Sequence, residues 1–232
     1  MKNISQIRNI SIWIFILPII ALNLCLFISV NYHLFEGTIF SVDQVGRTGF
    51  TIPYIDGNVS ISRTARSYPT YLIFKPAMII TALLLIKYWL ANNKLITTIA
   101  NENKRKYFLI FGVGSAIFLI VHSIFLGIKF DYDLYKFFRR FVILAFIIFE
   151  IVAQALLVIS IYKMKEKMEQ FINRKILILK IILVTVLTIT AFVSIPFLAS
   201  SGYAHFKHAL EWNYFVGVVL FYLLSFLFWK KS

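Results

Sequence analysis

Six long runs of apolar residues limit what this chain can fold into more than any other feature. They cover approximately residues 10–32, 71–90, 107–128, 141–162, 176–199 and 212–229. A helix of about 20 apolar residues crosses the ~30 Å hydrocarbon layer of a bilayer. The chain is 60% hydrophobic, whereas a soluble domain averages roughly 45–50%, so a single soluble core could not contain the surplus. We therefore predict an all-α polytopic integral membrane protein, in which residues 1–232 form one six-transmembrane-helix domain.

The distribution of charge predicts how the helices cross the membrane. The net charge is +14, but the basic residues are spread along the connections between the apolar runs, which does not indicate nucleic-acid binding. Placing both termini in the cytoplasm puts 15 of the 24 Lys and Arg residues on that side, as the positive-inside rule favours. Basic clusters at 104–106 and 163–167 adjoin helix ends, where they would meet anionic lipid at the cytoplasmic face. This pattern is the same in a bacterial inner membrane and in a eukaryotic endomembrane or plasma membrane. The sequence indicates no particular protein partner.

The connection at 34–70 is the only long one, and this topology places it outside. Residues 40–42 and 49–52 have strand-like composition, and Asp56-Gly57-Asn58 is a turn signal. A small β-hairpin over the outer helix ends is therefore an expectation for this loop.

Three polar residues lie within apolar runs, where burial in hydrocarbon is costly. Glu150 lies about ten residues into the fourth run, Gln154 follows at i+4 on the same face, and Asn23 lies midway along the first run. A carboxylate at the bilayer centre costs about 2.5–3.5 kcal/mol on insertion scales, so Glu150 and Gln154 should face the bundle interior, with Asn23 as a partner across helices. Glu150 either binds a proton or a headgroup, or is a protonated group that links helices.

A second group of polar residues lies at the outer ends of the helices. Arginine guanidinium groups match the geometry of phosphate, so this group predicts a site for a lipid headgroup. Its members are Arg63, Arg66, Lys75, His122, Arg139, His205, His208 and Glu211. The last three recur every three residues, which predicts one shared helix face, but H-x-x-H-x-x-E is not the H-E-x-x-H zinc pattern. We predict no metal and no cofactor, and no catalytic residue can be assigned, so enzymatic activity stays open.

One segment resembles a known membrane family. The residues Ile61-Ser62-Arg63-Thr64-Ala65-Arg66-Ser67-Tyr68-Pro69, followed by Ile73-Phe74, form I-S-x-T-x(3)-Y-P before a helix, and Leu210-Glu211-Trp212 opens the last run. This pattern is similar to the Frag/DRAM/Sfk family, which includes the damage-regulated autophagy modulators and the factor that remodels lipid after GPI attachment. The resemblance covers about 40 residues of motif and the six-span plan. It implies work on lipids in endomembranes or at the cell surface: GPI-anchor remodelling, phospholipid distribution or autophagy signalling.

Three hypotheses for function follow. The first is a protein that handles membrane lipids at the outer or lumenal leaflet, by recognising or remodelling a lipid or lipid anchor. The second is a small transporter or channel that uses Glu150, Gln154 and Asn23. The third is a non-catalytic scaffold or signalling protein, whose outer polar residues would scatter around the rim rather than converge on one cavity.

Overall fold

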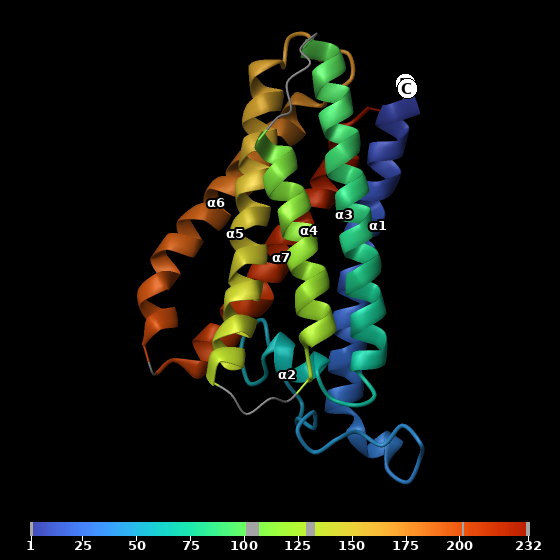
Figure 1. Cartoon of the computed structure of the whole chain (residues 1–232), viewed down its shortest axis with the longest axis vertical. Coiled ribbons are helices and arrows are strands. Elements are labelled where there is room, and N and C mark those ends of the chain that lie inside the picture. The colour runs from blue at the N-terminus through green and yellow to red at the C-terminus, as the bar shows by residue number, and fades with distance from the viewer. Residues whose placement is uncertain (1, 101–106, 129–132, 201, 231–232) are drawn as a thin grey trace.

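The computed structural model describes residues 2–100, 107–128, 133–200 and 202–230 (Figure 1). Six long helices dominate: α1 (Lys2–Val30), α3 (Tyr71–Ala100), α4 (Tyr107–Phe125), α5 (Asp133–Lys163), α6 (Arg174–Ala199) and α7 (Ala204–Phe228). A 3₁₀ turn, η1 (Tyr32–Phe35), follows α1, and a short helix, α2 (Ile61–Ala65), lies in the long loop.

All six long helices are long and apolar enough to cross a membrane. The predicted all-α six-helix bundle is confirmed, and the chain is a multi-pass membrane protein. Each helix includes most of its predicted apolar run, but several extend well beyond it. The helix α3 continues to Ala100, and α7 starts at Ala204, because backbone hydrogen bonds continue into polar sequence where no residue breaks the helix.

The helices pack as a ring in the order α1, α3, α4, α5, α6, α7, which closes where α7 contacts α1. Helices that follow one another in the chain are therefore mostly neighbours in space (Figure 1). The helix α6 is the least buried of the six, and most of its large side chains face outward, as expected for a helix that contacts lipid.

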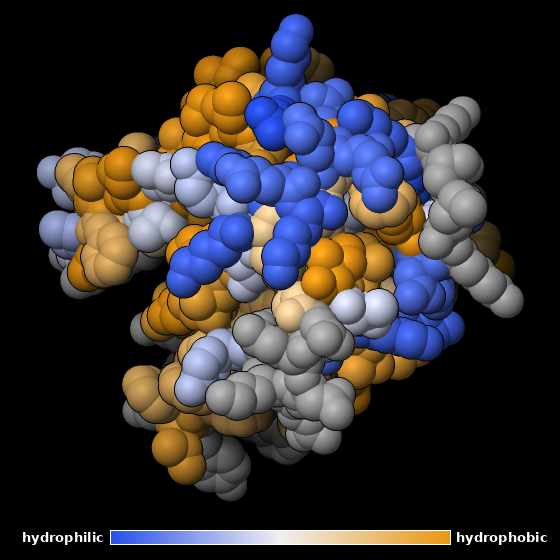
Figure 2. Space-filling view, turned by 90° about the horizontal axis from the view of Figure 1, so that it is seen from above, coloured by the Kyte–Doolittle hydropathy of each residue, from blue (hydrophilic) through white to orange (hydrophobic). Residues whose placement is uncertain are grey.

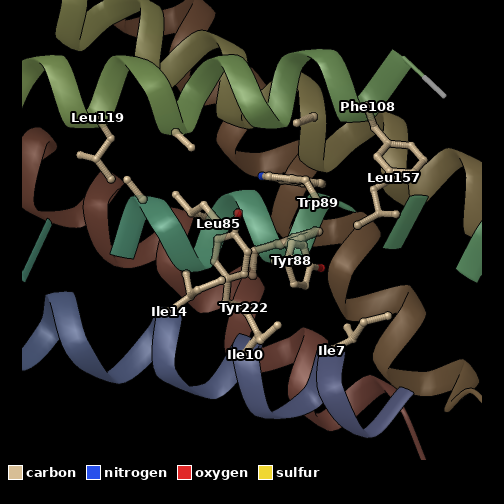
Figure 3. Packing of buried hydrophobic residues seen from close by; sticks show 14 of the residues in the cluster. Ile7, Ile10, Ile14, Leu85, Tyr88, Trp89, Phe108, Leu119, Leu157 and Tyr222 are labelled. Atoms are coloured by element: carbon tan, nitrogen blue, oxygen red, sulfur yellow. The ribbon is translucent and has the colours of Figure 1, made fainter. Parts of the chain in front are cut away.

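The core contains large aromatic side chains contributed by several helices. Figure 3 shows Tyr88 and Trp89 of α3 beside Tyr222 of α7, with isoleucines of α1 on one side and Phe108 of α4 on the other. The rings of Tyr88 and Tyr222 meet edge to face with centroids 5.0 Å apart, a favoured aromatic geometry. This contact fixes α3 against α7 across the centre of the ring.

Both termini lie at the end of the bundle opposite the long loop (Figure 1). Viewed onto that end, hydrophilic side chains gather over the helix ends while apolar side chains form the flanks (Figure 2). The last residue of α5, Lys163, and the connection to α6, with Lys165 and Lys167, lie at this end (Figure 1). The basic cluster at 104–106 lies outside the described residues. A cytoplasmic location for this end remains a prediction.

The loop at 34–70 contains no strand, so the expected hairpin is wrong. The turn signal is real, because Gly57 has a φ of +60° and Asp56 accepts hydrogen bonds from the loop around it. A Cβ on Gly57 would lie 1.8 Å from the carbonyl oxygen of His205, so only glycine permits this close approach to α7.

Side chains of α7, rather than a second strand, satisfy the backbone of the loop. Trp212 Nε1 donates to the Val59 carbonyl at 2.9 Å, and Asn213 Nδ2 donates to the Tyr54 carbonyl at 2.7 Å. Because buried backbone groups need partners of some kind, these bonds remove the need for a strand ladder. They hold the loop and α2 against the end of the helix ring.

Candidate functional site

A cavity of about 420 Å³ lies inside the helix ring. Its wall comes from α1, α2, α3, α4, α5 and α7 and is mostly apolar. Ser62, His122, Arg139 and Glu211 line it near the loop end, whereas Glu150 and Tyr222 line it deeper along the helices. We call it the central cavity. An apolar chamber with a few polar groups is typical of sites for small molecules.

Glu150 is fully buried in the wall of the central cavity. Its Oε1 accepts hydrogen bonds from Gln154 Nε2 at 3.0 Å and from the Tyr222 hydroxyl, and its Oε2 lies 2.6 Å from Ser115 Oγ. Gln154 Nε2 also donates to the Val218 carbonyl at 3.2 Å. The predicted inward orientation of Glu150 and Gln154 is confirmed, and the carboxyl group connects α4, α5 and α7.

Asn23 does not take part in this cluster, so its predicted contact with Glu150 is wrong. Its side chain is exposed and donates to the Ile19 carbonyl at 2.9 Å, while Tyr54 donates to its Oδ1 at 3.4 Å. Leu22 of α1 faces the core. The next residue along a helix is rotated by about 100°, which turns Asn23 away from the ring.

A second buried polar cluster lies toward the termini. Lys180 is only 1% exposed, and its Nζ donates to Ser225 Oγ at 2.8 Å and lies 4.0 Å from the ring centre of Phe221. Ser225 Oγ also lies 3.0 Å from the Tyr88 hydroxyl. Lys180 is one of the 15 basic residues that the predicted topology places on the cytoplasmic side, and its burial is not expected from the sequence, because a lysine about two turns from a helix end normally extends to the interface.

A larger cavity of about 620 Å³ lies at the loop end, between the loop, α3 and the start of α5. Its cationic lining residues are Arg66, Lys75 and Arg139, and its acidic one, among the described residues, is Asp43. We call it the loop-end cavity. Arg139 lines both cavities, so the two spaces adjoin at this side chain.

The arginines of the loop-end cavity lack hydrogen-bond partners in the described part of the chain. The Nε atoms of Arg66 and Arg139 are buried and make no hydrogen bond. Burial, followed by the nearby charges of Arg139 and Arg63, lowers the pKa of Arg66 from its ordinary value. Lys75 Nζ donates to the Ile124 carbonyl at 3.2 Å. Three positive groups therefore share this cavity with Asp43, and none of the three forms an ion pair with a carboxylate among the described residues.

The remaining predicted site residues contact the protein itself. Arg63 Nε donates to the Val45 carbonyl at 3.2 Å, and His208 Nδ1 lies 2.9 Å from the Gly57 carbonyl oxygen. Glu211 accepts from the backbone N–H groups of Ile61 and Ser62 at the start of α2. His205 is exposed and lines neither cavity.

The expected shared face of His205, His208 and Glu211 is therefore wrong. Each step of three residues rotates a side chain by about 300°. The first and last members consequently point roughly 120° apart.

Among the described residues, no group of three or more His, Cys, Asp or Glu could hold a metal ion.

Comparison of the chain with protein-family models, with curated proteins and with solved structures finds no match. The site must therefore be interpreted from its own geometry. Two of its residues had no signal in the sequence: Ser115, in a run of small residues, and Tyr222, in an apolar run. Their importance depends on helix positions that only the fold provides.

Proposed function

We propose that this protein binds a membrane lipid inside the helix ring, with the lipid headgroup at the loop end and hydrocarbon in the central cavity. The observation that carries the proposal is the pair of adjoining cavities, one cationic and one mostly apolar, which share Arg139. A membrane lipid likewise combines a polar headgroup, which would suit the cationic cavity, with hydrocarbon chains, which would suit the apolar one. The volume of the central cavity, about 420 Å³, falls within the ~300–1,000 Å³ of ligand pockets.

The positions of the polar residues also support lipid binding over a purely structural role. Arg66, Lys75, His122, Arg139 and Glu211 come from different elements, yet all line one or the other cavity. A scaffold would have no need to bury the Nε–H groups of Arg66 and Arg139 without acceptors among the described residues, since an unsatisfied buried donor costs about 1–3 kcal/mol. If the topology prediction holds, the bound headgroup lies at the outer or lumenal leaflet.

The resemblance to the Frag/DRAM/Sfk family agrees with this proposal in kind, because that family is associated with lipids. Membership of this chain in the family is itself a proposal. Two residues of the motif have structural roles here: Glu211 bonds the start of α2, and Arg66 follows its end.

A filled cavity tests the proposal. In Val219→Phe the larger ring occupies the central cavity, which Val219 lines, and Val193→Phe is the matched control because Val193 is 62% exposed on α6. Each protein is purified from membranes, and the co-purifying lipids are measured by mass spectrometry against the bulk membrane. We expect one enriched lipid class with the unmodified chain and the control, and its loss with Val219→Phe. Equal recovery from both variants, with both folded by circular dichroism, would contradict lipid binding in this cavity.

A transport role is the second candidate, since Glu150 forms part of the cavity wall. A carboxyl group in such a position can exchange a proton with a bound solute. If Glu150→Gln leaves uptake and its pH response unchanged in proteoliposomes, this candidate fails while lipid binding stands.

A further inference from the structure

The loop-end cavity has the chemistry of an anion site. Arg66 follows α2, Lys75 lies on α3 and Arg139 lies on α5, so three separate elements bring positive charge to one space. Arg66, Lys75 and Arg139 form no ion pair with a carboxylate in the described ranges. The Asp43 carboxylate instead accepts from the Tyr68 backbone N–H at 3.0 Å.

The unused donors of this cavity are numerous. The Nε–H groups of Arg66 and Arg139 are buried without partners, and Lys75 makes one hydrogen bond to protein although an ammonium group carries three protons. Buried donors without acceptors are costly, and like charges held together add to this cost. A ligand with negative charge and several oxygen atoms removes both penalties at once.

The packing around Arg66 is specific rather than incidental. Gly127, with a φ of +86°, brings the segment after α4 against Arg66, and a Cβ at this glycine would lie 2.9 Å from the Arg66 carbonyl oxygen. Arg47, at the same end of the molecule, shows the alternative, because it pairs with Glu36 at 3.2 Å. Among the described residues, the cations of the loop-end cavity form no such ion pair.

We propose that the loop-end cavity binds the phosphate group of a lipid. Phosphate suits two guanidinium groups better than a carboxylate does, since it presents more oxygens to the N–H groups that point outward in the plane of each guanidinium. Arg139 also lines the central cavity, so a phosphate bound beside it stands next to the space proposed for hydrocarbon. A phosphomonoester should bind tightest, because it carries about −1.5 to −2 charges and three free oxygens. The inference rests on the proposed lipid-binding function and specifies its substrate class.

Native mass spectrometry of the full chain in detergent micelles tests this proposal. The probes are dioleoyl phosphatidic acid, dioleoylglycerol, which lacks only the phosphate, and dioleoyl phosphatidylcholine. Inorganic phosphate is titrated as a competitor. The variants are Arg66→Gln and Arg66→Lys, with Arg174→Gln as the control, because Arg174 pairs with Glu169 at the opposite end of the bundle.

We expect phosphatidic acid to bind tightest and inorganic phosphate to compete with it. Arg66→Gln should weaken phosphatidic acid by about tenfold to a hundredfold, the range for a hydrogen-bonded charge, without changing dioleoylglycerol. Arg66→Lys keeps the positive charge but loses the planar set of guanidinium donors, so its affinity for phosphatidic acid should lie between those of the unmodified chain and Arg66→Gln. Arg174→Gln should match the unmodified chain. Thermal unfolding of each variant confirms that it is folded.

Two results would overturn the inference in different ways. If phosphatidic acid and dioleoylglycerol bind equally and Arg66→Gln changes neither, the protein binds lipid but not through phosphate, and only the inference fails. If inorganic phosphate binds in an Arg66-dependent way while no lipid binds, the site takes free phosphate and the proposed function fails as well.

Discussion

Replacement of Glu150 provides the sharpest test of how the centre of the bundle is built. Ser115 Oγ lies 2.8 Å from the Gly112 carbonyl oxygen and 2.6 Å from Glu150 Oε2, but a serine hydroxyl has one proton. If that proton goes to the carbonyl, as is common for serine in a helix, the contact with Glu150 needs a proton on Oε2. A neutral carboxyl group at this position is therefore compatible with its contacts to Ser115, Gln154 and Tyr222, and it avoids a buried charge in hydrocarbon.

The expected loss in the free energy of unfolding depends on which hydrogen-bond donors lose their acceptor when Glu150 is replaced. In Glu150→Ala, Ser115 still reaches the Gly112 carbonyl and Gln154 still reaches the Val218 carbonyl, whereas the Tyr222 hydroxyl loses the one acceptor that it has among the described residues. An orphaned buried hydroxyl costs about 1–3 kcal/mol, and the void left by the side chain adds roughly 1–2 kcal/mol. In Glu150→Gln, the amide oxygen replaces Oε1 and the amide N–H replaces the carboxyl O–H, so the cost should stay below about 1 kcal/mol.

The assay is the free energy of unfolding of each variant in mixed micelles, with increasing denaturing detergent and circular dichroism as the readout. The double variant Glu150→Ala with Tyr222→Phe removes the orphaned hydroxyl and should recover about 1 kcal/mol or more of the loss. If Glu150→Gln is as unstable as Glu150→Ala, the carboxyl group is not neutral and the proton count for Ser115 is wrong.

Two further predictions concern the loop and the helix packing. Thr51 and two backbone N–H groups donate to the Asp56 carboxylate, and these bonds, that of Thr51 foremost, lower the pKa of Asp56 from 3.8. The stabilisation of the loop by the Asp56 carboxylate is thus complete above pH ~4, and it is lost as the pH falls through the lower pKa of Asp56 in the folded protein. Limited proteolysis of the loop should therefore become faster at acid pH. Asp56→Asn should abolish this dependence of the proteolysis rate on pH. In Gly112→Ala the new Cβ would lie 2.3 Å from the ring of Trp89, so unfolding should require about 1–3 kcal/mol less, whereas Gly49→Ala, with open space around it, should match the unmodified chain.

The sequence predicts those features that depend on one helix at a time. The six spans follow from length and apolarity, and the inward orientation of Glu150 follows from the cost of a carboxyl group in hydrocarbon. The turn at Asp56-Gly57-Asn58 follows from the conformational freedom of glycine. Each of these arguments needs only local sequence and the properties of a bilayer.

Features that depend on how elements meet could not be predicted in the same way. The strand-like composition of residues 49–52 is compatible with a hairpin, but no strand forms there. Further along the loop, the carbonyls of Tyr54 and Val59 accept hydrogen bonds from Asn213 and Trp212 of α7 rather than from a second strand. Tertiary contacts override strand propensity in such a loop. Asn23 failed as a partner of Glu150 for a related reason, since hydropathy gives the depth of a residue but not the direction in which it faces.

At the loop end, polar side chains that already have hydrogen-bond partners in the protein can be told apart from those that could bind a ligand. Arg63, His208 and Glu211 each bond a backbone group of the loop or of α2, so their polar atoms are already used in holding the fold together. The guanidinium groups of Arg66 and Arg139 are held nearby with buried Nε atoms that bond nothing among the described residues. A folded chain normally pairs its buried donors, and the proposed ligand would supply acceptors for these two arginines. The proposed phosphate-bearing lipid combines the negative charge that would pair with them and the hydrocarbon that suits the adjoining apolar cavity.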